Sequence, residues 1–249
     1  MPGKHIVIIG ASSSIAEHCA RVWVKENDIK FTLVGRHPDR IEQIANDLKV
    51  RNPSCTVEPL LANFTDAATI NSLASNIASQ GKIDIVLIAH GSLPDQTRCQ
   101  HDLVASHEAL LVNGISPVLF AEAFVAPMQN ANAGTIAIIG SVAGDRGRKS
   151  NYVYGSAKGL VTRYAQGLQH RLAATGVRIV LIKPGPTDTP MTAHLKQQGA
   201  RLASVDSVAQ SIVDAIAHGK PVVYVPGKWA IIMMIIRHLP RFIFNKMDI

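Results

Sequence analysis

The chain has 249 residues, of which 47% are hydrophobic and 17% are charged, so it has enough apolar material for a large core. It contains no repeat, low-complexity segment or linker-like stretch, which argues against fibrous and disordered classes. The formal net charge of +7 comes from basic residues spread along the chain, without a basic stripe interleaved with aromatic residues. We therefore expect no nucleic-acid partner, and an anionic small ligand or an anionic membrane surface instead.

The cysteine and histidine residues indicate the redox state of the compartment and whether a metal site is expected. Cys19, Cys55 and Cys99 are dispersed and odd in number, which favours a reducing compartment over a disulfide framework or a zinc site. None of the ten histidines is paired with another at metal-ligand spacing, so we expect no metal. The apolar run near the N-terminus is too short for a signal peptide, and a cytoplasmic protein is expected.

Short apolar runs alternate with helical patterns along residues 1–226. Strands are predicted at residues 5–9, 30–34, 55–61, 83–89, 135–140, 177–182 and 221–225. Helices are predicted after the first turn to about residue 26, and then at 38–50, 66–80 with Asp66 as N-cap, 101–128 with a kink at Pro117, 152–175 and 205–218. This alternation indicates a single α/β domain with a Rossmann fold, a doubly wound seven-stranded parallel sheet with helices on both faces.

The first strand ends in a glycine-containing turn, GASSSIA at residues 10–16, which leads into a helix. Such a turn lets backbone N–H groups approach a pyrophosphate at the positive end of the helix, although a simple tight connection explains it equally well. At the end of the second strand, where NAD-specific sites place an acid, the chain has Arg36. A cation there suits a 2′-phosphate and favours NADP(H) over NAD(H). The alternative is a solvated arginine at a helix start.

Residues 141–158 carry the strongest chemical signal. Ser141 follows a buried strand, so its hydroxyl is expected at the carboxyl edge of the sheet, where ligands bind. Tyr154 and Lys158 are four residues apart, which places them on one face of a helix. A lysine ammonium beside a phenol is expected to lower the tyrosine pKa from about 10 toward neutral. Tyr154 could then exchange a proton with a carbonyl or alcohol oxygen near pH 7.

With these features in place, residues 4–191 resemble the short-chain dehydrogenase/reductase family. The resemblance maps the family's catalytic tetrad onto Asn113, Ser141, Tyr154 and Lys158. It implies that Tyr154 is the general acid/base and that Ser141 hydrogen-bonds the substrate oxygen. Lys158 would lower the Tyr154 pKa and bind the nicotinamide ribose, and Asn113 would hold a water that relays protons.

The resemblance also implies a set of cofactor-binding positions. Pro184, Gly185, Thr187 and Thr189 match the segment that contacts the nicotinamide carboxamide, and Ser12 and Arg36 match positions that hold the 2′-phosphate in NADP-preferring members. The complete expected set is Gly10, Ser12, Ser13, Ser14, Ile15, Arg36, Asn63, Phe64, Ala89, His90, Gly91, Tyr154, Lys158, Pro184, Gly185, Thr187 and Thr189.

The chain departs from the family pattern at three places. Ser14 and Ala16 replace the second and third glycines of the first turn. The sequence IAHG at residues 88–91 replaces the usual N-N-A-G, and Asn63 replaces an aspartate expected near the adenine. These changes do not alter the tetrad. They fall at positions expected to contact the cofactor, and they can therefore change its affinity.

Residues 227–249 form a basic and apolar tail, with eight consecutive apolar residues at 229–236. A bilayer-spanning helix needs about 20 apolar residues, so we do not expect this tail to cross a membrane. Two interpretations remain open: packing against the body or a sister subunit, or contact with anionic lipid at the inner face of a membrane. The tail, with its HLPR run at residues 238–241, also loosely resembles that of the family branch that reduces decaprenylphosphoryl 2-keto-pentoses.

We therefore predict an NADP(H)-dependent carbonyl reductase or alcohol dehydrogenase that acts on a small or lipid-linked ketone, such as a sugar ketone. The alternative is a non-catalytic NADP(H)-binding scaffold or regulatory protein on the same fold. A homodimer or homotetramer is expected from the family resemblance.

Overall fold

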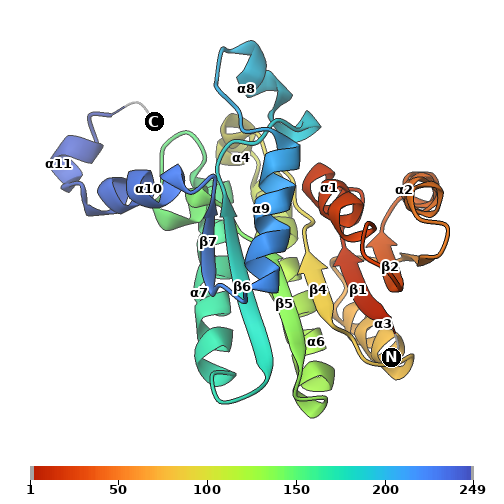
Figure 1. The fold of residues 1–249 in the computed structure, drawn as a ribbon. Coiled ribbons are helices and arrows are strands. Elements are labelled where there is room, and N and C mark those ends of the chain that lie inside the picture. Colours follow the sequence, from red (N-terminus) through yellow and green to blue (C-terminus); the bar gives the residue numbers. More distant parts are fainter. Residues whose placement is uncertain (1–2, 248–249) are drawn as a thin grey trace.

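A seven-stranded sheet runs through the centre of residues 3–247, the part of the chain that the computed structural model describes (Figure 1). Its strands are β1 (Lys4–Ile9), β2 (Ile29–Gly35), β3 (Thr56–Leu61), β4 (Ile85–Ile88), β5 (Gly134–Ile139), β6 (Val177–Pro184) and β7 (Val222–Val225). All neighbouring strands are parallel, in the order β3-β2-β1-β4-β5-β6-β7. This confirms the predicted Rossmann-type α/β fold. The strand order reverses between β1 and β4, which is where such sheets bind ligands.

The central strands are apolar throughout because both faces of the sheet are buried. In β1, Ile6 and Ile8 point into one hydrophobic cluster, and Val7 and Ile9 point into the other. All four side chains are fully buried. A continuous apolar run is therefore needed to satisfy both faces of this strand, since successive side chains alternate between them.

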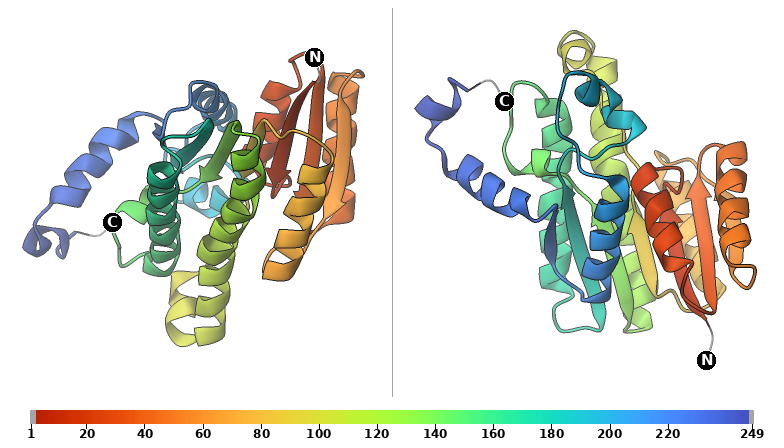
Figure 2. Two further views of the ribbon diagram at one scale, coloured as in Figure 1. Left: turned by 90° about the horizontal axis from the view of Figure 1, so that it is seen from below. Right: turned by 45° about the horizontal axis from the view of Figure 1, so that its top comes forward.

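Helices cover the two faces of the sheet (Figure 2). One face carries α1 (Ser14–Trp23), α2 (Pro38–Arg51) and α9 (Val205–Ala217), and the other carries α3 (Ala67–Ser79), α6 (Ser116–Asn130) and α7 (Tyr152–Arg171). Trp23 is buried in the first cluster, whereas Phe120 and Phe124 are buried in the second. Asp66 caps α3 as predicted, since its carboxylate accepts the N–H of Thr69 at 2.7 Å.

The prediction of one helix over residues 101–128 is wrong. The structure has α4 (Gln96–His101), α5 (Leu103–Leu110), a π-helical turn η1 (Leu111–Ile115) and then α6. Asp102 starts α5 as a new helix by accepting the N–H groups of Val104 and Ala105. Pro117 lies in the first turn of α6 and has no N–H for the carbonyl four residues earlier, so the regular helical ladder cannot continue through η1.

Residues 103–130 form the one helical stretch, within the described part of the chain, that is long and apolar enough to cross a membrane. Its mean hydropathy is 1.8 over the most apolar window, and 56% of that window is buried inside the protein. Phe120, Phe124 and Val125 on this stretch pack against the sheet. Its apolar character is therefore accounted for by its place in the core.

The tail forms α10 (Lys228–His238) and α11 (Arg241–Phe244), which extend from the edge strand β7 (Figure 1). Arg146, from the segment after β5, donates to the carbonyl oxygens of Ile236 and Leu239. Its guanidinium also lies 3.7 Å from the centroid of the Phe244 ring. Arg146 thus connects the tail to the segment that follows Ser141.

Candidate active site

A pocket of about 830 Å³ lies at the carboxyl ends of β1, β4, β5 and β6. It brings together thirteen of the predicted site residues: Ser13, Ile15, Ala89, His90, Gly91, Asn113, Ser141, Tyr154, Lys158, Pro184, Gly185, Thr187 and Thr189. Six predicted residues are outside its lining: Gly10, Ser12, Ser14, Arg36, Asn63 and Phe64. The short elements η3 (Pro190–Thr192) and α8 (Ala193–Gln197) contribute a further wall.

Ser141 follows β5 directly and keeps an extended backbone, with φ of −170°. Its Oγ accepts the N–H of Ala143 at 3.1 Å, and its hydroxyl shares a hydrogen bond with Tyr154. The strand therefore fixes the serine backbone, while the first turn of η2 (Val142–Asp145) orients the hydroxyl. Ser141 and Tyr154 meet across the pocket as the sequence predicts.

The pKa of Tyr154 moves in the opposite direction from the one expected. Burial raises this pKa above its ordinary value, and the hydrogen bond from Ser141 offsets the rise only in part. The prediction that Lys158 brings Tyr154 toward neutral is therefore wrong for this geometry, because loss of water around the phenolate is the larger effect. Tyr154 holds its proton at neutral pH.

Lys158 lies one helical turn beyond Tyr154 on α7, as its spacing predicts. Its Nζ is 5.8 Å from the centroid of the Tyr154 ring and donates to the carbonyl oxygen of Ile139 at 3.0 Å. The side chain is buried, and burial lowers the pKa of Lys158 to about 8. Lys158 can therefore change its protonation state near physiological pH.

Asn113 lies in the π-helical turn η1 and is fully buried. Its Nδ2 donates to the carbonyl of Ala109 at 2.9 Å, and its Oδ1 accepts the N–H of Ser92 at 2.8 Å. A Cβ on Gly91 would lie 2.9 Å from Asn113 Oδ1 and 3.7 Å from Lys158 Nζ. The missing side chain at Gly91 thus leaves room for both Asn113 and Lys158 next to this glycine. The role of Asn113 in a proton relay stays a prediction.

The turn after β1 fits an anionic ligand. Gly10 has φ of +81°, and a Cβ there would lie 2.6 Å from the backbone N of His90, so glycine is required at this position. No side chain caps the start of α1 at Ser13. The first N–H groups of this ten-residue helix are therefore available to a phosphate.

Arg36 is exposed directly after β2 and forms no ion pair within residues 3–247. Its charge contributes to lowering the pKa of His90, which places it close to the rim of the pocket. Its neighbour Arg40, in contrast, forms an ion pair with Glu17 at 2.7 Å. The Oδ1 of Asn63 accepts hydrogen bonds from Thr65 and does not face the pocket.

With this geometry established, comparisons with known proteins define the family. The family described as short chain dehydrogenase matches residues 4–200. The chain belongs to the short-chain dehydrogenase family. It is 32% identical over 245 residues to an uncharacterised oxidoreductase of Mycobacterium tuberculosis, an alignment that covers 97% of this chain and 96% of that protein. An uncharacterised oxidoreductase of Streptomyces coelicolor is 27% identical over 247 residues, covering 99% and 96%.

Solved structures of the family share the fold of this short-chain dehydrogenase. One from Sphingobium yanoikuyae, determined in complex with NADPH, superposes with a TM-score of 0.82 at 20% identity, covering 96% of this chain and 97% of that one. One from Mycobacterium ulcerans gives a TM-score of 0.80 at 18% identity, covering 98% of each chain. These relatives give no support to the narrower resemblance to decaprenylphosphoryl 2-keto-pentose reductases.

His90 occupies one of the positions that depart from the family pattern, and its surroundings define its tautomer. The ring lies edge-to-face against Phe64 and Phe120, and its Nε2 is 2.8 Å from Ser116 Oγ. Ser116 gives its one proton to the carbonyl of Phe64, so it accepts the hydrogen bond from Nε2–H of His90. Burial lowers the pKa of His90 to about 3, which keeps the ring neutral. Its Nδ1 is then a buried acceptor without a partner among the described residues.

The pocket is also lined by polar residues outside the predicted site set, among them Gln96, Arg148 and Asn151. Arg148 and Asn151 lie in the segment between Ser141 and Tyr154, which the sequence already marked as important. Their place between Ser141 and Tyr154 is the sequence feature that could have identified both residues. Gln96 lies in residues 92–100, a segment expected to cover the substrate, but nothing in the sequence distinguished it there; the packing of α4 against α7 brings it to the pocket.

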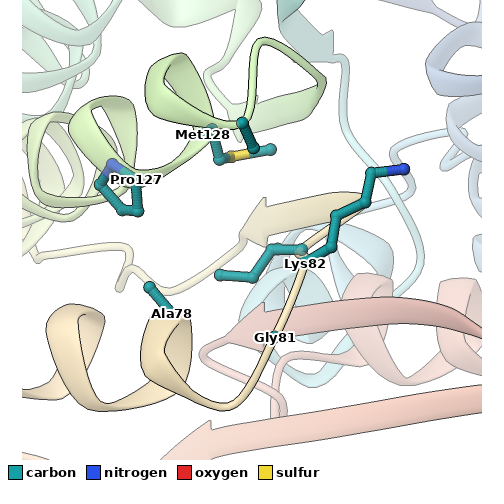
Figure 3. Close-up of a pocket in the computed structure, with 7 residues that line it drawn as sticks. Ala78, Gly81, Lys82, Pro127 and Met128 are labelled. Carbon is teal, nitrogen blue, oxygen red and sulfur yellow. The ribbon is translucent and has the colours of Figure 1, made fainter. Parts of the chain in front are cut away.

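A smaller cavity of about 260 Å³ lies between the ends of α3 and α6 (Figure 3). Ala78, Ile83, Pro127 and Met128 make its walls apolar, and Lys82 is engaged by Asp84 at 2.8 Å. Nothing in this lining offers acid/base chemistry. Within residues 3–247, no group of three or more His, Cys, Asp or Glu side chains is placed to hold a metal ion.

Proposed function

We propose that this short-chain dehydrogenase is an NADP(H)-dependent oxidoreductase that interconverts a ketone and an alcohol, with Tyr154 as the group that exchanges the proton. The observation that carries the proposal is the hydrogen-bonded pair of the buried Ser141 and the half-buried Tyr154, with Lys158 beside it, in a pocket at the carboxyl ends of the strands. Surface residues that merely share this spacing would have no reason to converge in one pocket.

The residues around the pocket fit a nicotinamide dinucleotide. The uncapped start of α1 offers N–H groups to the pyrophosphate, and the turn at Gly10 allows close approach. Pro184, Gly185 and Thr187 line the opposite wall. When bound there, the nicotinamide supplies or accepts the hydride.

The protein's own residues orient the substrate and move the proton. Ser141 would hold the substrate oxygen by hydrogen bonding, beside the Tyr154 hydroxyl. Because burial keeps Tyr154 protonated at neutral pH, it can donate its proton to the oxygen as a carbonyl is reduced. Lys158, with its pKa lowered to about 8, can return a proton to Tyr154 after this donation. Asn113 and Lys158 both lie next to Gly91, so Asn113 could take part in supplying that proton.

Arg36 supports a preference for NADP(H) over NAD(H). It is an exposed guanidinium without an ion pair at the end of β2, where a 2′-phosphate lies in NADP-specific sites. The NADPH complex of the structural neighbour from Sphingobium yanoikuyae is consistent with this choice. For the substrate we favour a sugar ketone or a lipid-linked ketone, and the exposed apolar side chains of the tail support the second.

The test is a fluorescence titration with NADPH and NADH on the wild type, Arg36→Ala and Tyr154→Phe, followed by a ketone-reduction assay. We expect tight NADPH binding, an affinity loss of about tenfold or more that is selective for NADPH in Arg36→Ala, and loss of turnover with retained binding in Tyr154→Phe. Binding of neither nucleotide at tens of micromolar would contradict the proposal. Retained turnover in Tyr154→Phe would remove Tyr154 from its role.

A further inference from the structure

The unpartnered buried polar atoms of the described residues are concentrated at one place. Four side-chain nitrogen or oxygen atoms are shielded from water without a hydrogen-bond partner: His90 Nδ1, Gln96 Nε2, Arg148 Nε and Asn151 Oδ1. All four residues line the pocket that holds Tyr154. Leaving such groups unpaired is costly, so folded proteins rarely keep them without a ligand or an ordered water to bind.

Three of these residues come from two neighbouring segments. Gln96 begins α4, and Arg148 and Asn151 lie in the loop that leads from η2 to α7. The amide of Gln96 is held in place because its Oε1 accepts the N–H of Val153 at 3.0 Å. Its Nε2 is thereby left as a fixed donor inside the pocket.

Arg148 brings a positive charge to the same wall. Its side chain forms no ion pair within residues 3–247, and its Nε is fully shielded from water. The residue as a whole is half-buried, and a guanidinium that is partly removed from water is stabilised by an anionic acceptor such as a phosphate or carboxylate. Burial lowers the pKa of Arg148, as expected for a cation that lacks such a partner.

Asn151 adds an acceptor to this set. It occupies the N-cap position of α7, yet its side chain does not cap the helix. Its Oδ1 is instead buried beside the pocket without a donor. A substrate hydroxyl would satisfy it, since a hydroxyl donates to one group while it accepts from another.

We infer that Gln96, Arg148 and Asn151 form a substrate subsite that recognises an anionic, hydroxylated carbonyl compound, with the anion on Arg148 and Gln96 and a hydroxyl on Asn151. This inference rests on the proposed function, because it assigns the substrate class of the same pocket. The subsite shares the pocket with Ser141 and Tyr154, so it would orient the carbonyl by holding the rest of the molecule.

The test compares two probes that differ only in charge, dihydroxyacetone phosphate and dihydroxyacetone, as ketone substrates with NADPH. We expect the wild type to favour the phosphate by at least about tenfold in kcat/KM. Arg148→Met is expected to bring this ratio close to one. Gln96→Glu keeps the acceptor for Val153 but replaces the donor with a negative charge, and it should also lower the ratio.

Arg163→Met, which removes an exposed guanidinium on α7, is the matched control and should keep the wild-type ratio.

Binding of dihydroxyacetone phosphate to the Tyr154→Phe protein, measured by calorimetry, separates this inference from the proposed function. Binding that is lost in the Arg148→Met double variant supports the subsite even if no ketone is reduced. Equal kcat/KM values for the two ketones in the wild type would overturn the inference and leave the proposed function standing. The same conclusion follows if the phosphate fails to bind at millimolar concentration, or if Arg148→Met, folded by circular dichroism, retains the ratio.

Discussion

Tyr154, Lys158 and His90 sit in one pocket, and one physical cause dominates their ionisation. Removal from water raises the pKa of Tyr154, lowers that of Lys158 to about 8 and lowers that of His90 to about 3. Each group is pushed toward its neutral form, since burial penalises the charged form. At the scale of single residues, burial therefore keeps Tyr154 and His90 neutral at physiological pH and brings the pKa of Lys158 close to that pH.

Because His90 is buried as a neutral ring, the free energy of unfolding depends on pH. Its folded pKa of about 3 lies below the ordinary value of 6.5, so only the unfolded chain takes up a proton as pH falls below about 6.5. Stability is fully present above that pH and should fall by up to ~1.4 kcal/mol per pH unit as the solution is acidified. His90→Gln can keep the hydrogen bond to Ser116 through its amide nitrogen. In this variant we expect unfolding to take up about one proton fewer, so the free energy of unfolding should fall less steeply as the pH is lowered. Denaturant unfolding between pH 4 and 7 measures it.

Cys19→Ala is the control for this experiment. It replaces another buried side chain, one that does not titrate between pH 4 and 7, and its thiol pKa is raised by burial. We expect it to lower stability by a similar amount at every pH in this range. An unchanged slope in His90→Gln would show that His90 does not carry the acid sensitivity.

Among the elements, the tail is joined to the segment after Ser141 by few contacts. Arg146 binds the last carbonyls of α10 and lies against Phe244, while Met233 is the buried side chain of α10. Trp229 lies against Gly185 so closely that a Cβ on this glycine would be 2.0 Å from the indole Nε1. The tail therefore contacts both the Ser141 segment and the Pro184-Gly185 turn that line the pocket.

Removal of the Arg146 side chain should loosen α10 and α11 without unfolding the body. In Arg146→Ala we expect amide hydrogen exchange in residues 228–244 to become about tenfold faster or more, because hydrogen bonds to two carbonyls and the contact with Phe244 are lost. Exchange in β1 and β5 should be unchanged. Arg163→Ala, on the exposed face of α7, serves as the comparison. Unaltered exchange in the tail would show that other contacts hold it.

At the scale of the whole molecule, two of the regions that carry exposed apolar side chains are the tail and the helices α5 and α7. Ile231, Met234, Ile235, Phe242 and Ile243 are exposed on the tail. A second group on α5 and α7 contains Leu103, Val104 and Leu160, of which Leu103 is 84% exposed. The second group is compatible with a homodimer or homotetramer, which stays a prediction from the family.

We propose that the exposed surface of the tail contacts anionic lipid. Its exposed apolar side chains are accompanied by four exposed cations, Lys228, Arg237, Arg241 and Lys246, and residues 227–247 contain no acidic side chain. Apolar area flanked by cations is the pattern of a helix that lies at a membrane surface. The packing of Trp229 and Met233 on the body and this contact use different sides of α10, so the two interpretations of the tail are compatible.

We expect the full-length protein to float with vesicles of phosphatidylcholine and phosphatidylglycerol, at about 3:1, and not with phosphatidylcholine alone. The double variant Ile231→Ser/Ile235→Ser should lose this binding, and higher salt should weaken it. Val50→Ser removes an exposed apolar side chain from α2, far from the tail in sequence, and should leave flotation unchanged. Failure of the wild type to float, together with a self-association that the double variant abolishes, would assign the surface to a second copy instead.

The sequence alone determined the seven strands, most of the helices and the α/β class of the fold, but not the division of residues 96–130 into separate helices. The buried strands needed continuous apolar runs, as in residues 6–9, and the helix start at Asp66 needed a capping carboxylate. The spacing of Tyr154 and Lys158 determined that both side chains share one face of α7. These features could be predicted because they depend on neighbours within about one or two turns of the chain.

Only the tertiary structure decided the chemistry of the pocket. The packing of α4 on α7 brings Gln96 to Arg148 and Asn151, although more than 50 residues separate them in the chain. The direction of the Tyr154 pKa shift likewise depends on how completely distant segments exclude water, and this effect exceeds that of the Ser141 hydrogen bond. Burial and pairing are set by residues far apart in sequence, so spacing alone does not reveal them.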